Sequence, residues 1–136
     1  MRKRVIVTAV GFIITFVANT VIAMTIIGPM FNARLGISRN PEKDGLNFPA
    51  IIGGYLGITI FMVWLTIALK GKTWLQKGLT VGIATALSAN IASYLIVAGW
   101  SVADGWSMFF SAVFDSFATI IGALVITFIL RKSEQQ

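Results

Sequence analysis

The chain has 136 residues, of which 57% are hydrophobic and only 12% are charged, about half the charged fraction of a typical soluble domain. Its mean hydropathy is +0.86. Four spanning helices of ~20 residues each would leave only short loops and tails, with no room for a folded soluble domain. The composition therefore predicts an all-α membrane protein with a single transmembrane domain over residues 1–136.

The net charge is +6, from eleven Lys and Arg residues against five Asp and Glu residues. The basic residues stand at segment ends and not in one patch, which is typical of topology signals and not of a nucleic-acid-binding surface. The sequence contains no Cys and no His. Disulfides, thiolate nucleophiles and the commonest metal ligand and general base are excluded, so we expect no metal and no cofactor.

Four apolar stretches follow one another along the chain, at about residues 5–31, 48–69, 79–102 and 106–130. Each is long enough to cross ~30 Å of hydrocarbon as a helix. The first stretch is about twice as long as the apolar core of a signal peptide, which makes cleavage the weaker interpretation. The pattern predicts four transmembrane helices.

The connection after the first helix, residues 32–47, is the polar and irregular region of the chain. Pro29 is expected to end or kink the first helix. Pro49 suits the first turn of the second helix, where its missing N–H costs nothing. A solvated loop is the simplest interpretation of the connection, and a short interfacial helix or a lid over a pore mouth are the alternatives.

The distribution of Lys and Arg predicts the orientation. The two termini and the second connection carry eight basic residues, against three in the first connection and none in the last; the eight are Arg2, Lys3, Arg4, Lys70, Lys72, Lys77, Arg131 and Lys132. The positive-inside rule therefore predicts cytoplasmic termini and a place in the inner (plasma) membrane. Three of the four tryptophans fall at predicted interfaces, whereas Trp64 lies inside the second helix, where packing would explain it.

A weak internal repeat relates the first helix to the third. Residues 10–12 and 18–19 match residues 81–83 and 89–90 at a constant offset, and the second and fourth helices match less well. If the repeat reflects duplication, the molecule consists of two like-oriented helical hairpins. Chance agreement between apolar sequences is the alternative.

Asp115 is the only ionisable residue well inside a predicted helix, where insertion costs about 2.5–3.5 kcal/mol. A small, polar face of the fourth helix surrounds Asp115, which should therefore point into the bundle. This face consists of Ser111, Asp115, Ala118 or Thr119, and Gly122.

Counting from the outer ends of the helices places one polar residue of each helix at the same depth, roughly 14–15 Å. The four residues are Asp115, Asn90, Asn19 and Thr59. They predict a hydrogen-bonded layer in which Asp115, with no Lys, Arg or His at that depth, is protonated or paired with a bound cation. The layer binds an ion or a ligand in one interpretation, and is a polar clamp that fixes helix register in the other.

Two stripes of small residues predict close helix packing, either within the monomer or with a second copy or a partner protein. They consist of Gly82, Ala86, Ala89 and Ser93 in the third helix and of Gly53 and Gly57 in the second.

The first helix closes in Gly28-Pro29-Met30-Phe31, which is followed by Asn32-Ala33-Arg34-Leu35-Gly36 and three further helices. This layout resembles an uncharacterised family of small four-helix bacterial membrane proteins across most of the chain. The resemblance implies the fold and the membrane location, and it brings no activity and no site residues.

No pair of nucleophile and base, no carboxylate dyad and no metal-ligand cluster can be assembled from this sequence, so we do not expect an enzyme. The sequence favours a small integral membrane protein with a non-enzymatic helix-packing role, as a subunit or assembly component of a membrane complex. The alternative is an oligomeric channel or a proton- or cation-linked transporter of a small solute that uses Asp115. The expected partners are the lipid bilayer and a second copy or another membrane protein, and not nucleic acid.

Overall fold

The computed structural model describes residues 2–35 and 45–131. Every regular element in these ranges is helical. The first helix comprises α1 (Arg2–Ile22), the π-helical turn η1 (Ala23–Ile27) and α2 (Gly28–Leu35), and the second is α3 (Phe48–Ala68). The third comprises α4 (Trp74–Thr85), the π-helical turn η2 (Ala86–Ile91) and α5 (Ala92–Trp100), and the fourth is α6 (Gly105–Arg131).

Four of these helical stretches are long and apolar enough to cross a membrane: Lys3–Phe31, Phe48–Ala68, Trp74–Trp100 and Gly105–Arg131. The predicted all-α fold with four candidate spanning helices is therefore confirmed for the described part of the chain.

Capping explains where two of the helices begin. Pro49 lies in the first turn of α3, as predicted, and the Asn47 side chain accepts a hydrogen bond from the backbone N–H of Ala50. The third helix begins at Trp74, before the predicted start near residue 79, because Thr73 and Gln76 form a capping box. The apolar pattern missed this turn because its residues are partly polar.

Pro29 does not end the first helix, which continues to Leu35. The wider turn η1 directly precedes it, and the N–H of Gly28 donates to the carbonyl of Ala23, five residues back. Such a turn gives room to a proline ring inside a helix and accounts for its missing N–H. The predicted connection at 32–47 is thus helical up to residue 35, and its residues 36–44, where a loop, an interfacial helix or a lid were the options, lie outside the described ranges.

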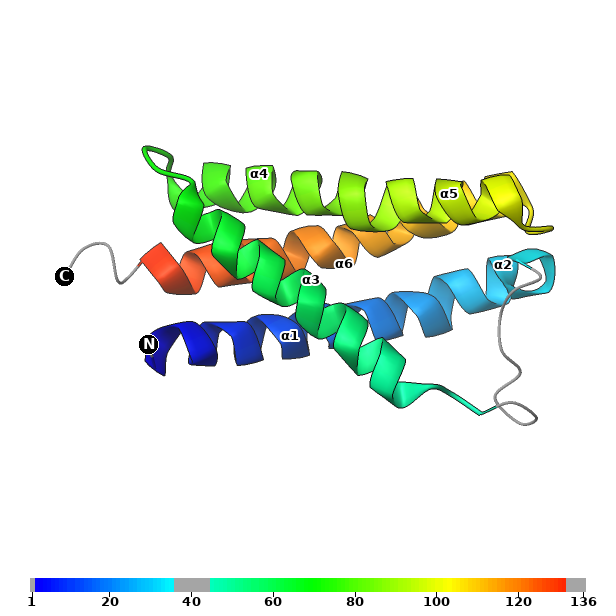
Figure 1. Cartoon of the computed structure of the whole chain (residues 1–136), viewed down its shortest axis with the longest axis horizontal. Coiled ribbons are helices and arrows are strands. Elements are labelled where there is room, and N and C mark those ends of the chain that lie inside the picture. Colours follow the sequence, from blue (N-terminus) through cyan, green and yellow to red (C-terminus); the bar gives the residue numbers. More distant parts are fainter. Residues whose placement is uncertain (1, 36–44, 132–136) are drawn as a thin grey trace.

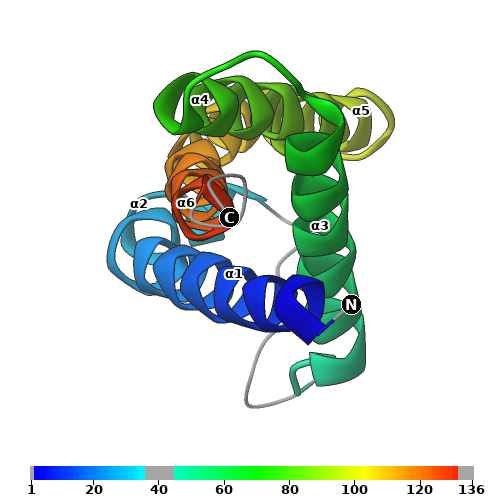
Figure 2. The ribbon, with the colours of Figure 1, turned by 90° about the vertical axis from the view of Figure 1, so that its left-hand side faces the viewer.

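The helix α6 is the centre of the bundle, and it contacts segments of each of the other three helices. Figure 2 shows α6 between α1 and α4, and α3 crossing the bundle on the other side. The start of α1, the connection between α3 and α4 and the end of α6 lie at one end of the molecule (Figure 1). The second and fourth helices therefore occupy different places, and the two hairpins are not equivalent in packing.

The interior is small and polar, whereas most large apolar side chains face outward. Eleven buried side chains are Ser, Thr or Asn: Thr15, Asn19, Thr59, Thr66, Thr85, Asn90, Ser107, Ser111, Ser116, Thr119 and Thr127. Lipid tails are as apolar as Leu, so burial of apolar surface gives little preference between inside and outside in a membrane. Close packing and hydrogen bonds must select this arrangement.

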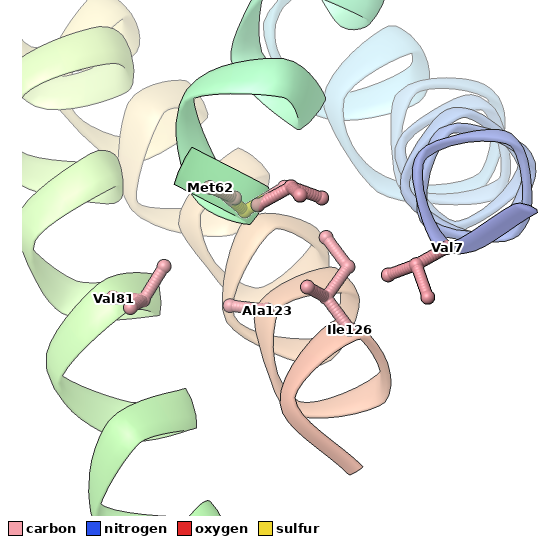
Figure 3. Packing of buried hydrophobic residues seen from close by; sticks show 6 residues of the cluster. Val7, Met62, Val81, Ala123 and Ile126 are labelled. Atoms are coloured by element: carbon pink, nitrogen blue, oxygen red, sulfur yellow. The ribbon is translucent and has the colours of Figure 1, made fainter. Parts of the chain in front are cut away.

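An apolar cluster fills the bundle at the end where α1 begins. Its six buried side chains come from α1, α3, α4 and α6 and are shown in Figure 3: Val7, Met62, Val63, Val81, Ala123 and Ile126. Trp64 of α3 does not belong to it, because its side chain is 61% exposed and its ring lies 6.0 Å from that of Phe61. Trp64 thus lies on the outer surface of the monomer, and its expected packing role stays a prediction.

Two glycines at matched positions of the repeat bring their helices close to α6. A Cβ added to Gly11 of α1 would lie 2.6 Å from Cγ1 of Ile126, and one added to Gly82 of α4 would lie 2.9 Å from Cα of Ile120. The first and third helices thus approach α6 closely through corresponding residues. The matching sequences of the first and third helices therefore make similar contacts with α6, although the second and fourth helices occupy different places in the bundle.

We expect the substitution Gly82→Ala to destabilise the fold by about 1–3 kcal/mol, because the clash is with a backbone atom and α4 must shift to relieve it. Gly99→Ala is the matched control: nothing lies within 4 Å of a Cβ at Gly99, so this change should be neutral or slightly stabilising. Unfolding by SDS, followed by circular dichroism, measures both. Equal effects would contradict the close packing of α4 on α6.

Candidate functional site

Asp115 lies ten residues into α6, about 15 Å from its start. Its Oδ2 accepts a hydrogen bond of 2.6 Å from the hydroxyl of Tyr94 in α5. Asp115 and Tyr94 are both half-buried. Tyr55 of α3, also half-buried, is within electrostatic reach of the carboxyl group. The helices α5 and α6 thus bring one carboxyl group and one phenol into contact.

A second hydrogen bond joins the same two helices one turn further along. The Asn90 amide donates from Nδ2 to Oγ1 of Thr119 over 2.9 Å, and both residues are buried. The Thr119 hydroxyl in turn donates to the main-chain carbonyl of Asp115 over 3.3 Å. Neighbouring turns of the third and fourth helices are therefore fastened at two adjacent points.

The π-helical turn η2 decides which side chains make these bonds. The N–H of Ala92 donates to the carbonyl of Leu87, five residues back, so the turn contains one residue more than an α-helical turn. The extra residue rotates the rest of the helix. Asn90 and Tyr94 consequently face α6, where uninterrupted α-helical spacing would place Ala89 and Ser93.

This rotation explains why only part of the small-residue stripe predicted in the third helix is buried. Gly82 and Ala86 are buried, as a packing stripe requires, but Ala89 is only half-buried and Ser93 is exposed. The expected packing of Ser93 within the monomer is therefore wrong.

The stripe predicted in the second helix packs against nothing in the described monomer. Gly53 and Gly57 are exposed, and no atom lies within 4 Å of a Cβ built on either residue. Gly122 of α6, in contrast, faces α1, because a Cβ there would collide with the Thr15 hydroxyl. Close helix approach inside the monomer thus depends on the glycines of α1, α4 and α6.

The predicted hydrogen-bonded layer does not form as expected. Thr59 is buried, but its hydroxyl donates to the carbonyl of Tyr55 in its own helix. Asn19 is buried, and its Oδ1 has no hydrogen-bond partner. Only Asn90 and Asp115 of the predicted four make bonds between helices in the described ranges, and their partners are Thr119 and Tyr94.

Tyr94 was missed as a site residue, although the sequence contains a signal for it. Asn90 and Tyr94 are four residues apart, as are Asp115 and Thr119, so each helix carries two polar residues on neighbouring turns. Matching such pairs between helices would have indicated two cross-links. A search for one polar residue per helix could not indicate these two cross-links.

Four buried side-chain oxygen atoms lack a hydrogen-bond partner in the described structure: Thr15 Oγ1, Asn19 Oδ1, Thr85 Oγ1 and Ser111 Oγ. Buried polar groups are expensive when unpaired, the more so in a membrane, where bulk water is absent. Of these residues, Ser111 lies one helical turn before Asp115.

The described ranges contain no group of three or more Asp, Glu, His or Cys side chains that could hold a metal ion. The oxygen ligands that the structure brings into direct contact are the carboxyl group of Asp115 and the hydroxyl group of Tyr94. Comparison with protein-family models, with curated proteins and with solved structures found no match. The resemblance to small four-helix bacterial membrane proteins therefore stays a prediction.

Removal of the Thr119 hydroxyl should destabilise the bundle. Thr119→Val keeps the shape of the side chain but leaves the Asn90 amide without its acceptor, at a cost of about 0.6–1.7 kcal/mol. Thr59→Val is the matched control, since Thr59 is equally buried and bonds only to its own helix. SDS unfolding of both variants, and of the pair Thr119→Val and Asn90→Ala in a double-mutant cycle, measures the coupling. A coupling of zero would show that the bond does not fasten the helices.

Proposed function

We propose that the chain is a small integral membrane protein with a non-enzymatic helix-packing role, acting as a subunit or assembly component of a membrane complex. The proposal rests on one observation: α3 turns its glycines outward, where nothing in the described monomer packs against them. Only 22% of the most apolar part of α3 is buried, the same share as in the first helix, against 44% for α6.

Glycines in open space need an explanation in a spanning helix. Each lowers helix stability by about 1 kcal/mol relative to Ala, and neighbouring helices in membranes use such residues to approach closely. Gly53 and Gly57, one turn apart, share a face with Ile60 and Trp64, which are 53% and 61% exposed. A partner helix could therefore approach α3 closely at Gly53 and Gly57 and contact the side chains of Ile60 and Trp64 beside them.

The same proposal includes the orientation in the inner (plasma) membrane, with both termini cytoplasmic. Support comes from the charges at the two ends of the bundle. The end at which α1 begins and α6 ends carries Lys3, Arg4, Lys70, Lys72, Lys77 and Arg131. The connection between α5 and α6, at the opposite end, carries the acidic residue Asp104. The positive-inside rule assigns the basic end to the cytoplasm.

The alternative function, an oligomeric channel or a proton- or cation-linked transporter that uses Asp115, also has an observation in its favour. Asp115 is half-buried, and Ser111, one helical turn before it, has a buried hydroxyl group without a hydrogen-bond partner. Substrate and ion sites of transporters often lie near the middle of the bilayer.

If α3 packs against a partner, Gly57→Leu should abolish assembly, because the added side chain blocks close approach from outside without touching the monomer. Gly99→Leu adds the same volume to another open position and should leave assembly intact. Native gel electrophoresis after solubilisation in a mild detergent reports the size of the complex, and circular dichroism checks the fold. Assembly of unchanged size in Gly57→Leu would contradict the role of this face.

The orientation can be tested with single cysteines, because the natural chain contains none. Val102, between α5 and α6, is 96% exposed, and Lys72, between α3 and α4, is also exposed. We expect a membrane-impermeant maleimide to label Val102→Cys in intact cells and Lys72→Cys only after permeabilisation. The reverse pattern would place the termini outside.

A further inference from the structure

Asn19 of α1 and Ser111 of α6 each carry a buried oxygen atom without a hydrogen-bond partner, and the register of α1 against α6 places both residues relative to Asp115. Two close approaches give the register: Gly11 meets Ile126, and Thr15 meets Gly122. The two helices are therefore antiparallel, and a step of four residues along α1 matches a step of four residues in the opposite direction along α6.

One further step of this antiparallel register sets Asn19 against Ala118, which is fully buried. Ala118 belongs to the turn that carries Asp115, since residues three apart on a helix are neighbours. The π-helical turn η1 begins only at Ala23, so the register holds as far as Asn19. Asn19 is 3% exposed, and its Oδ1 therefore lies inside the bundle next to the Asp115 turn.

Ser111 approaches Asp115 from the other direction along α6. A Ser or Thr hydroxyl in a helix can satisfy itself on the carbonyl four residues back. Ser116 and Thr127 of the same helix do so, with distances of 2.7 and 3.0 Å. The fully buried Ser111 hydroxyl does not, so it is not satisfied by its own helix.

One carboxyl oxygen of Asp115 is available to coordinate a ligand. Oδ2 accepts the Tyr94 hydroxyl, and Oδ1 has no hydrogen bond within the described part of the chain. No Lys, Arg or His occurs in residues 5–31, 48–68, 78–100 or 105–130, so none of the four candidate spans supplies a positive charge at that depth.

We propose that Asp115, Asn19, Ser111 and Tyr94 form a binding site for a small monovalent cation near the middle of the bundle. Carboxylate, amide and hydroxyl oxygens are the ligands that hard cations prefer. A single carboxylate neutralises a single positive charge, whereas a divalent ion would leave a net charge in the membrane. The site goes beyond the packing role proposed above and does not depend on it.

Either an alkali ion or a protonated amine fits this chemistry. Oxygen ligands from three helical segments suit Na⁺ or K⁺. The aromatic rings of Tyr55 and Phe16, whose centroids are 5.5 Å apart, could in addition attract an alkylammonium ion to the α3 side of the site.

The test uses the full-length protein in lipid nanodiscs at constant ionic strength. Binding of ²²Na⁺ is measured directly, and K⁺ and methylammonium are then tested as competitors. We expect saturable binding of one cation per chain. Displacement by K⁺ alone identifies an alkali-ion site, and displacement by methylammonium at lower concentration identifies a site for protonated amines.

Matched variants separate a built site from general attraction of counter-ions. Asp115→Asn should abolish binding, whereas Asp104→Asn, which removes an acid outside the spans, should not change it. Ser111→Ala should weaken binding about tenfold without loss of stability, because the hydroxyl has no partner in the protein. Ser116→Ala, which removes a buried hydroxyl bonded to its own helix, should bind like the parent chain.

Three results would overturn the proposal. The first is the absence of saturable binding of Na⁺ in the parent chain together with no carboxyl infrared change on addition of Na⁺, K⁺ or methylammonium. The second is parent-like binding by Ser111→Ala, which folds even if Asp115→Asn does not. The third is equal weakening by Asp104→Asn and Asp115→Asn, which would mean that the cations are only surface counter-ions.

Discussion

One extra residue in the third helix determines how that helix meets α6. Without the π-helical turn η2, Ala89 and Ser93 would continue the face that begins with Gly82. With it, Asn90 and Tyr94 reach Thr119 and Asp115 and make the two hydrogen bonds between the helices. A π-helical turn costs some regular hydrogen bonding, and the two cross-helix bonds offset that cost in a region where unpaired polar groups are expensive.

The remaining packing follows from the membrane as solvent. Apolar burial does not distinguish a protein interior from lipid, so the bundle is specified by where backbones approach and where polar atoms pair. Gly11, Gly82 and Gly122 provide close approach at α6, the helix that all the others contact. The helix α3 lacks such a contact through its glycines and crosses the bundle obliquely (Figure 1). It contacts the bundle instead through its buried inner face, with Thr59, Met62 and Thr66.

The sequence predicts the helices well because length and apolarity decide whether a segment can span a membrane. It also predicts that Asp115 faces a polar interior, because a single acidic side chain exposed to lipid is energetically costly. Hydropathy does not predict which residue Asp115 meets, although the matched spacing of the polar pairs indicates Tyr94. That choice depends on the η2 rotation, and an extra residue in one turn leaves no mark in hydropathy. Thr59 shows the same limit: its own helix satisfies its hydroxyl, which no pattern of polar residues reveals.

The two proposals meet in α3, which carries Gly53 and Gly57 on its outer face and the half-buried Tyr55 between them in sequence. These three residues lie within about one and a half helical turns, so a shift of α3 moves its outer and inner faces together. A partner packed on its glycines would then also set the position of Tyr55. Under the two proposals, assembly at the outer face of α3 and the geometry of the polar interior are linked through the position of a single helix.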